Sequence, residues 1–327
     1  LTARKTILLD DFENLGGWSA LASPSARLEI AQDTGQTGRA MRLDFEFQDG
    51  AGWVIARKAF PMRLPDNFAF HFLMRGDTPP GDTEFKLADS RENVWWFKQR
   101  EYAMPSDWHP VTIKRRQISL AWGPGGPLDE VAVIEFAFAP GVPGKGSVWI
   151  DELSFEEREP THAYTLNPAV RASTTAEGHT PEAVLDPNPA VRWHSGVLAE
   201  EQWLLLDFLT PREYGGLVID WDRDDYAVDY ETQISDDGET WQTVYSVRDG
   251  DGQRDYLYLP DAESRYLRLN LQRSNRGQGY GIHRLRVQSY EFSSSPNAFF
   301  QAIARDAPRG LYPRYFQGEQ CYWTVGG

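Results

Sequence analysis

The sequence predicts an all-β chain of two tandem β-sandwich domains, followed by a short helical or extended tail. Three observations lead to this prediction. The chain has 327 residues, which is long for one domain and suits two. Short runs of residues alternate between apolar and polar, which is the period of a half-buried strand. The 28 Gly and 21 Pro supply many turns, and 12 Trp, 14 Tyr and 17 Phe supply large core side chains.

Residues 1–156 are expected to form the first domain, because alternating runs fill them. In one such run Leu43, Phe45 and Phe47 share one face of a strand, while the residues between them are charged. The same two-faced pattern recurs at residues 68–72, 84–87, 111–114, 134–138 and 148–150. Turns rich in Pro and Gly separate these runs, so a β-sandwich, and specifically a jelly roll, is predicted.

A tight hairpin is predicted within residues 230–241, which read YETQISDDGETW. Tyr230, Thr232 and Ile234 alternate with polar neighbours, as in a half-buried strand. Gly238 follows two aspartates and supplies the positive φ that such a turn requires. Residues that favour strands resume directly after it.

The remaining boundaries follow from charge and proline. Residues 157–167 form a linker, and residues 168–292 form the second domain. Residues 293–327 are a tail or the start of a further domain. A helix begins in this tail with Ser295 as its cap and Pro296 in its first turn. The aromatic end of the chain either packs on the second domain or begins a further one. Because exposing so many aromatic side chains is costly, we favour a further domain.

Composition excludes several classes of protein. The net charge of −15 and pI near 4.9 argue against a nucleic-acid partner. Cys321 is the one cysteine, so neither an intrachain disulfide nor a cysteine zinc site is expected. No apolar run is long enough to span a bilayer, and no signal-peptide core opens the sequence.

Four segments of the first domain carry a resemblance to a known family. They are LDDFENLGGW (9–18), EFKLADSRENVWWFKQREY (84–102), DWHPVTIKRRQISLAWGPGG (107–126) and GKGSVWIDELSF (144–155). Together they resemble a jelly-roll module of the galactose-binding-like type, found at the N-terminus of bacterial proteins that act on polysaccharides. The resemblance implies carbohydrate binding and a secreted or periplasmic protein.

Two strands of this module place polar residues on one inferred face. If Phe85, Leu87, Trp95 and Phe97 point into the core, their neighbours point outward. The candidate carbohydrate-binding residues are Glu84, Lys86, Trp96, Lys98 and Arg100. An exposed Trp can stack on a pyranose while charged groups bind hydroxyl or acidic groups. The cations of this face favour acidic polysaccharides. The alternative is a solvated sheet face with cross-strand ion pairs.

The resemblance also implies a calcium ion. In related jelly rolls calcium joins the first strand to the last through carboxylates, which here are Glu13 and Asp151. Main-chain carbonyls of the loop Thr34 to Arg39 would complete a shell of oxygen ligands, which calcium prefers. The alternative is that both residues are ordinary surface acids.

The second domain resembles the discoidin domain, also called the coagulation factor V/VIII C-type domain. The matching segments are RAS (171–173), PEAVLD (181–186), RWHS (192–195), QWLLLDF (202–208), IDW (219–221), the hairpin at 230–241, RYLRL (265–269) and YGIHRL (280–285). In this family loops at one end of the sandwich bind ligands. In this sequence those loops contain Arg254, Arg273 and Asn275, which are further candidate carbohydrate-binding residues, although such loops are often merely solvated. The four tryptophans of the pattern, Trp193, Trp203, Trp221 and Trp241, are expected in the core.

Sugar-binding discoidin domains bind a structural calcium at a turn that corresponds to residues 186–193. Asp186 and Asn188 are the candidate ligands here, with Glu291 as a possible closing ligand. Pro187 replaces the usual Gly and Val191 replaces the usual Thr. Val has no hydroxyl oxygen, so one ligand is lost unless its carbonyl serves.

No motif for catalysis is recognised. Adjacent acids such as Asp236 and Asp237 are not a glycosidase pair, which must flank one bond at a defined separation. His179, His194 and His283 are scattered and expected to be structural. We therefore expect a non-catalytic polysaccharide-binding fragment, the N-terminal accessory part of a larger secreted glycoside-active protein. The alternatives are an adhesion module for protein partners and a fragment that contributes to a glycoside hydrolase active site.

Overall fold

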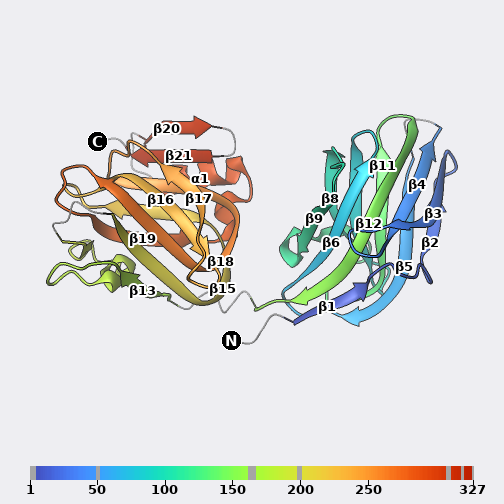
Figure 1. The fold of residues 1–327 in the computed structure, drawn as a ribbon, viewed down its shortest axis with the longest axis horizontal. Helices are drawn as coiled ribbons and strands as arrows, with labels where there is room; N and C mark the ends of the chain where they lie inside the picture. Colours follow the sequence, from blue (N-terminus) through green and yellow to red (C-terminus); the bar gives the residue numbers. More distant parts are fainter. Residues whose placement is uncertain are drawn as a thin grey trace. The chain divides into compact units, whose positions relative to one another are not determined.

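Two compact units divide the chain, residues 1–163 and 164–327 (Figure 1). The structure, a computed structural model, describes residues 5–48, 52–160, 167–196, 201–306, 311–317 and 320–325. Antiparallel strands make up most of both units, which confirms the all-β prediction. Within the described residues, no helix has the length and apolar character needed to cross a membrane.

The described residues of the first unit form twelve strands. They are β1 (Lys5–Asp10), β2 (Ser19–Ala22), β3 (Ala26–Thr34), β4 (Arg39–Phe47), β5 (Val54–Arg63), β6 (Phe68–Asp77), β7 (Gly81–Ala88), β8 (Val94–Tyr102), β9 (His109–Lys114), β10 (Ser119–Trp122), β11 (Glu130–Pro140) and β12 (Gly144–Glu157), with a 3-10 turn at Arg115–Gln117.

These strands form two sheets that face each other. Sheet A has the order β3-β4-β12-β6-β9, with β1 also paired to β12, and sheet B has the order β10-β8-β7-β11-β5-β2. Aromatic rings fill the space between the sheets. Phe85 of sheet B lies 5.1 Å from Phe70 of sheet A and 5.5 Å from Phe136, measured between ring centroids. Since every second residue of a strand points into this core, the residues between them line the two outer faces.

The described residues of the second unit form strands, short turns and an α-helix. The strands are β13 (Ala169–Ala172), β14 (Trp193–His194), β15 (Gln202–Trp221), β16 (Ala227–Ser235), β17 (Gln242–Val247), β18 (Arg254–Ser274), β19 (Gly281–Gln288), β20 (Leu311–Gln317) and β21 (Gln320–Val325). The helix is α1 (Pro296–Asp306), and 3-10 turns occupy Pro181–Leu185 and Tyr290–Ser293. The long strands β15 and β18 pair along most of their length and carry bulges, where the register between them shifts.

The predicted hairpin joins β16 to β17. The carboxylate of Asp237 accepts hydrogen bonds from the main-chain N–H groups of Glu239 and Thr240, each at 2.8 Å. These bonds hold the pKa of Asp237 well below its usual range. Gly238 has φ of 78°, the conformation that the sequence required. The turn residues of this hairpin therefore act as the sequence indicated.

Two of the four tryptophans expected in the second core lie there. Trp193 and Trp221 are buried, but the expectation is wrong for Trp203 and Trp241, which are half-buried and outside the core cluster. The guanidinium of Arg268 stacks on the Trp241 ring, with its Cζ 3.9 Å from the ring centroid. A planar cation that stacks on an aromatic ring stabilises it at the surface, so the Trp241 ring does not have to be buried in the core.

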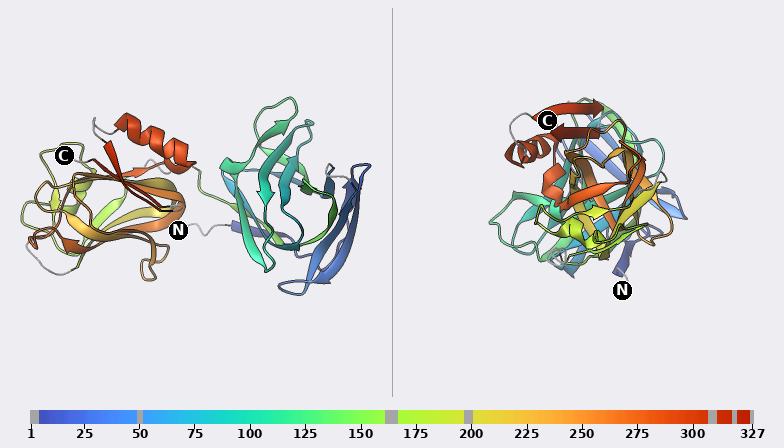
Figure 2. Two further views of the ribbon diagram at one scale, coloured as in Figure 1. Left: turned by 90° about the horizontal axis from the view of Figure 1, so that it is seen from above. Right: turned by 90° about the vertical axis from the view of Figure 1, so that its left-hand side faces the viewer.

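The helix of the tail packs on the second sandwich (Figure 2). Phe299 and Ile303 lie on its buried face and form a small cluster with the side chains of Val218, Tyr256, Tyr258 and Phe292. At the end of the helix, Asp306 forms an ion pair with Arg286 at 2.9 Å. Strand β21 pairs with β18. The described part of the tail therefore packs on the second sandwich. This is the alternative that the sequence analysis did not favour.

Candidate functional site

The outer face of sheet B brings together four of the five residues proposed for the first domain. Phe85, Leu87 and Trp95 are buried in the core, so their strand neighbours point outward. Across the β7–β8 ladder, Glu84 lies opposite Lys98 and Lys86 lies opposite Trp96. Arg100 is exposed near the end of β8, close enough to lower the pKa of Asp82 slightly, while Lys98 is the main cause of that shift. We call Glu84, Lys86, Trp96, Lys98, Trp122 and Glu135 the sheet B face.

Two tryptophans dominate this face. The rings of Trp96 and Trp122 meet edge to face, with centroids 6.0 Å apart and an interplanar angle of 80°. Trp122 is 52% exposed, which is unusual for so large an apolar side chain. Lys86 Nζ lies 5.4 Å from the Trp122 centroid, and Lys98 Nζ lies 5.1 Å from the Trp96 centroid. Each ring is therefore held beside a cation.

The lysines of the sheet B face are already paired. Glu84 accepts from Lys86 at 2.8 Å and from Lys98 at 2.9 Å, and Lys98 also pairs with Asp82 at 2.8 Å. The hydrogen bond to Asp82 is the main reason that the pKa of Lys98 is raised. The sequence suggested a cationic surface that favours acidic polysaccharides. That expectation does not hold for this face, because carboxylates on the same strands neutralise both lysines.

Sequence reasoning missed Trp122 and Glu135. Glu135 of β11 lies opposite both Lys86 and Arg57 in the ladders and is only 7% exposed. Its place follows from register between strands that are distant in the sequence. Trp122 was missed because β10 has a bulge between Leu120 and Trp122, which breaks the alternation that would assign its face.

The proposed calcium ligands of the first unit approach the same loop. Glu13 Oε1 accepts from the main-chain N–H of Arg39 at 2.8 Å, and Asp151 Oδ2 accepts from that of Gln36 at 2.9 Å. Gly38 and Gly35 make this approach possible. A Cβ at Gly35 would lie 2.5 Å from Asp151 Oδ2, and a Cβ at Gly38 would clash with Glu13. The loop is therefore shaped around two carboxylates.

Asp151 fits a cation site on chemical grounds. It is fully buried, and burial raises its pKa despite three hydrogen bonds from main-chain N–H groups. No Lys or Arg of the described chain pairs with it. Among the described residues, no group of three or more His, Cys, Asp or Glu side chains could hold a metal. A calcium ion here would thus need main-chain carbonyls in addition to Glu13 and Asp151.

In the second unit, Arg254, Asp186 and Asn188 line one pocket of about 480 Å³. Arg254 forms ion pairs with Asp220 and with Asp306. The other lining residues are Pro187, Pro189, Trp221, Gln253, His283 and Arg284. The volume lies within the range of small-molecule sites, roughly 300–1,000 Å³, and both apolar and polar groups line it.

In the proposed second calcium site, the side-chain oxygens of both candidate ligands accept hydrogen bonds from the backbone of their own turn. Asp186 Oδ1 accepts from the main-chain N–H of Asn188 at 2.8 Å, and Asn188 Oδ1 accepts from that of Ala190 at 3.0 Å. Both residues are exposed. These contacts are those of ordinary turns in which a side chain caps its own backbone.

The remaining two candidates hold loops together. Arg273 binds both carboxylate oxygens of Asp229, at 2.6 and 3.1 Å, and also reaches Asp249 at 2.9 Å. Asn275 donates to the carbonyl of Asp224 at 2.7 Å, and its oxygen accepts from the Tyr226 N–H at 3.2 Å. Their polar groups are thus largely used within the loops that carry them.

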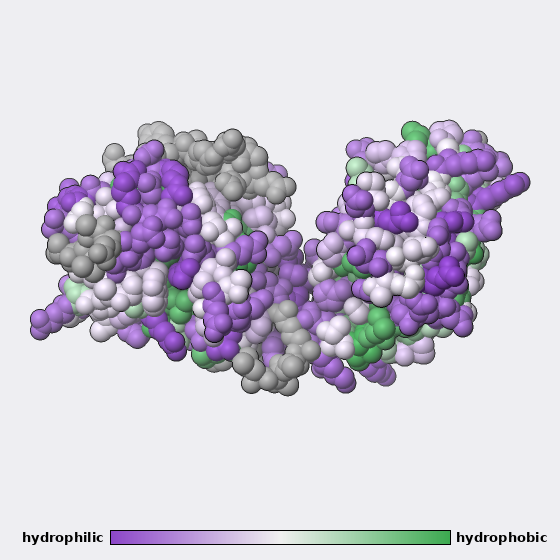
Figure 3. Space-filling model, in the orientation of Figure 1, coloured by the Kyte–Doolittle hydropathy of each residue, from purple (hydrophilic) through white to green (hydrophobic). Residues whose placement is uncertain are grey.

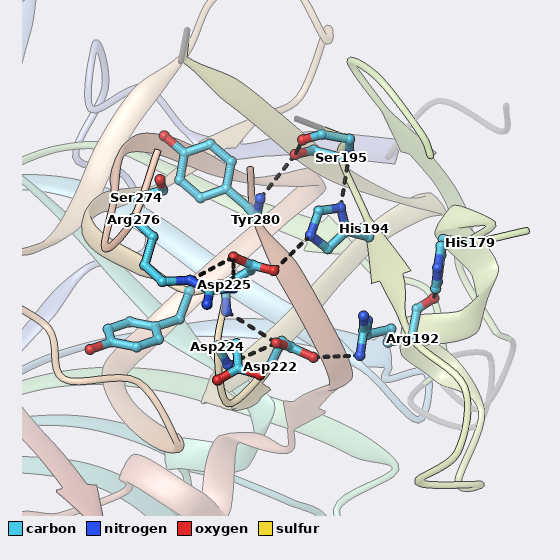
Figure 4. A network of polar contacts seen from close by, with 12 residues as sticks. His179, Arg192, His194, Ser195, Asp222, Asp224, Asp225, Ser274, Arg276 and Tyr280 are labelled. Carbon is cyan, nitrogen blue, oxygen red and sulfur yellow. Dashed lines mark hydrogen bonds and ion pairs between the residues drawn. The ribbon is translucent and has the colours of Figure 1, made fainter. Parts of the chain in front are cut away.

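A polar network lies at the same loops (Figure 4). His194 Nδ1 accepts from the N–H of Gly196 at 3.0 Å, so this nitrogen is unprotonated, and Nε2 faces Asp225 at 3.3 Å. Asp225 also pairs with Arg276. Ser195 Oγ accepts from the Tyr280 N–H and donates to a carbonyl rather than to His194. Serine, histidine and aspartate are therefore neighbours here without the geometry of a nucleophilic triad.

Comparison with known proteins gives one family match. Residues 169–285 match the family model described as "F5/8 type C domain". No curated protein matches the sequence. Among solved structures, chitosan-binding module 2 of a chitosanase/glucanase from Paenibacillus sp. IK-5, in complex with chitotriose, is 28% identical, covers 38% of this chain and 98% of its own, and has a TM-score of 0.36. A family 11 carbohydrate-binding module from Clostridium thermocellum, in complex with a β-1,3-1,4-mixed-linked tetrasaccharide, is 18% identical, covers 46% and 94%, and has a TM-score of 0.39.

Proposed function

With residues 169–285 forming an F5/8 type C domain as the premise, we propose that the chain binds polysaccharide without catalysing a reaction on it. The observation that carries the proposal is the sheet B face of the first unit. There the exposed ring of Trp122 stands beside Trp96 and a set of lysines and glutamates fixed by ion pairs.

This face has the two features that a bound sugar chain needs. An exposed indole offers an apolar plane on which the C–H face of a pyranose can stack. Glu84, Lys86 and Lys98 hold one another in place, so their remaining donors and acceptors are fixed before a ligand arrives. Because their charges cancel locally, hydroxyl groups of a neutral polysaccharide are better partners for them than free anions.

The extent of the face favours an internal stretch of polysaccharide over a chain end. Trp53, which immediately precedes β5, is 44% exposed. Four strand spacings separate β10 from β5, which is about 19 Å at the usual distance between strands. A sheet face of this width can accept several consecutive sugars.

Hydrophilic residues cover most of the visible described surface of both units, and apolar residues form small separate patches (Figure 3). The described part of the face in that view has no large apolar patch of the kind that mediates stable binding between proteins. This supports the polysaccharide over the adhesion alternative. Secretion and a place within a larger glycoside-active protein belong to the same proposal.

The pocket of the second unit is a candidate for one further sugar residue. Arg284 lines it and has no ion pair with the described residues, while Trp221 supplies an apolar wall. A monosaccharide unit could use the free guanidinium as a hydrogen-bond donor. Arg284→Ala should then weaken polysaccharide binding by a chain whose sheet B face is intact.

A calcium ion at Glu13 and Asp151 completes the proposal as a structural cofactor. The buried carboxylate of Asp151 and the close-fitting glycines of the loop support it. Calcium would hold the loop Gly35 to Arg39 against the strand ends. Its role is to stabilise the module rather than to contact the sugar.

Affinity electrophoresis tests the function directly. The full chain would be run through gels that contain a neutral β-glucan, galactomannan, polygalacturonate or alginate. Retardation by at least one neutral polysaccharide, lost in a Trp96→Ala/Trp122→Ala variant with an unchanged circular dichroism spectrum, is the expected result. Equal mobility in all gels would refute polysaccharide binding.

A further inference from the structure

A second aromatic and cationic cluster lies on the outer face of sheet A, away from the sheet B face. Arg75 of β6 lies close to two tryptophans, with its Cζ 4.2 Å from the ring centroid of Trp149 and 5.2 Å from that of Trp108. Met74 and Ile150, the strand neighbours of Arg75 and Trp149, are buried in the core. Arg75 and Trp149 lie opposite each other in the ladder and point outward.

The guanidinium of Arg75 has no acidic partner. None of the described residues forms an ion pair or a hydrogen bond with it, and its buried Nε lacks an acceptor. The terminal nitrogens are not among the buried atoms without a partner, so solvent reaches them. An arginine in a protein stays charged at any ordinary pH. Among the described residues, this half-buried cation is therefore uncompensated.

The nearby carboxylates are bound elsewhere. Asp33 accepts from Arg42 at 2.8 Å and from the indole N–H of Trp149 at 3.1 Å. The hydrogen bond from Trp149 is the main reason that the pKa of Asp33 falls to about 2. Asp44 accepts from Arg42 at 2.9 Å and from Ser147 at 2.6 Å. Both of these carboxylates thus form ion pairs with Arg42, and neither pairs with Arg75.

We propose that Arg75 is a binding site for the carboxylate of a uronic acid residue in an acidic polysaccharide. The inference rests on the proposed function for the class of ligand, but it concerns a different face of the first unit. The guanidinium carbon lies over both indole rings, while the terminal N–H groups stay open to solvent. A planar carboxylate accepts two parallel hydrogen bonds from such an edge, which is the strongest common geometry for this pair.

The stacking also explains why affinity does not require a cationic surface. The indoles fix the side chain before the ligand binds, so little rotamer freedom is lost on binding. The chain as a whole carries a net charge of −15, which would repel a polyuronate at long range. Over about 10 Å or less at physiological salt, a single oriented cation can still dominate, because longer-range repulsion is screened.

The test uses the full chain and compares polygalacturonate, dextran sulfate and a neutral β-glucan by titration calorimetry. Arg75→Gln is expected to weaken polygalacturonate binding by roughly tenfold to a hundredfold, as for loss of a charge-assisted bidentate pair. The matched control is Arg42→Gln, which removes the same charge from the same face but from a residue that is already paired. It should leave binding within about twofold of wild type.

Arg75→Lys controls for misfolding of the Arg75→Gln variant, because it keeps the positive charge and the aliphatic stem of the side chain. It loses only the planar guanidinium group. It should also lose most of the polygalacturonate affinity. Equal losses for Arg75→Gln and Arg42→Gln, or no binding by wild type, would overturn the site. Equal loss of dextran sulfate binding would overturn the carboxylate as the recognised group. Neutral glucan binding should not respond to Arg75, so failure of this inference and failure of the sheet B face are separable.

Discussion

Trp96 and Trp122 meet edge to face on the outer surface of sheet B, with ring centroids 6.0 Å apart. They come from neighbouring strands, β8 and β10, which pair in an antiparallel ladder. One ring supports the other, so the exposed face of Trp122 is held in a fixed orientation. A fixed aromatic plane binds a sugar at a lower entropic cost than a mobile one. This pair is therefore the centre of the proposed site.

The first prediction concerns Glu84, which accepts hydrogen bonds from both Lys86 and Lys98. Glu84→Gln keeps the shape of the side chain but removes its charge, so the sheet B face gains net positive charge. Binding of neutral polysaccharide should weaken by several fold, and retardation by polygalacturonate should increase. Affinity electrophoresis at low and high salt would measure both, and salt should abolish only the new acidic preference. A variant that behaves as wild type with both polymers would show that the ion pairs do not shape specificity.

The second prediction concerns the calcium site. Calcium should raise the melting temperature of the full chain, and a chelator should lower it again, because the ion compensates the buried charge of Asp151. Asp151→Asn removes that charge at nearly the same volume. It should stabilise the calcium-free chain and make the melting temperature independent of calcium.

The matched control for the calcium experiment is Asp186→Asn, at the exposed turn of the second unit. Its carboxylate caps its own backbone, so this substitution should leave the calcium response unchanged. If instead Asp186→Asn abolishes the response and Asp151→Asn does not, calcium binds the discoidin turn. The prediction for the first unit would then be wrong.

The third prediction concerns the buried face of helix α1. Phe299 is fully buried against Tyr258 and Phe292, with ring centroids 5.2 and 5.1 Å away. Phe299→Ala should destabilise the second unit by about 3–5 kcal/mol, the usual cost of a large cavity. Gln301→Ala, on the exposed side of the same helix, should have little effect. Urea unfolding would measure both, and equal effects would mean that the helix does not pack as described.

The fourth prediction concerns the pH dependence of the same helix. The hydrogen-bonded ion pair with Arg286 holds the pKa of Asp306 below its ordinary value. A depressed carboxyl pKa stabilises the folded state above the unfolded pKa, and this stabilisation is lost as the pH falls through the folded pKa. Amide protons of α1 should therefore exchange faster below about pH 4, and less so in Asp306→Asn, which has lost the charge already. Identical pH profiles for both chains would contradict this role of Asp306.

Strand alternation predicted much of the sheet B face. Between residues 84 and 98 the β7–β8 ladder is regular, so alternation was enough to separate Trp95 in the core from Trp96 outside it. The charge balance of the face was not predictable in the same way. It depends on which carboxylates meet each lysine across strands, and a single sequence gives residue types but no register.

Other features depended on irregular structure or on packing between distant segments. The bulge before Trp122 hid the most exposed ring of the site. Trp241 was expected in the core because aromatic residues of the family pattern usually lie there, yet Arg268 covers it at the surface. Arg75 attracted no notice in the sequence, because its lack of a partner is visible only once the strands beside it are placed.

The measurement that tests the central claim most directly is titration calorimetry with the neutral polysaccharide that retards the wild-type chain most strongly. Trp122→Ala should weaken binding by about 1–3 kcal/mol, the range for one large apolar side chain, with an unchanged melting temperature because the ring is 52% exposed. Trp108→Ala, which removes a tryptophan from the opposite face of the same unit, should bind as wild type does. Equal affinity of Trp122→Ala and wild type would contradict the proposed site.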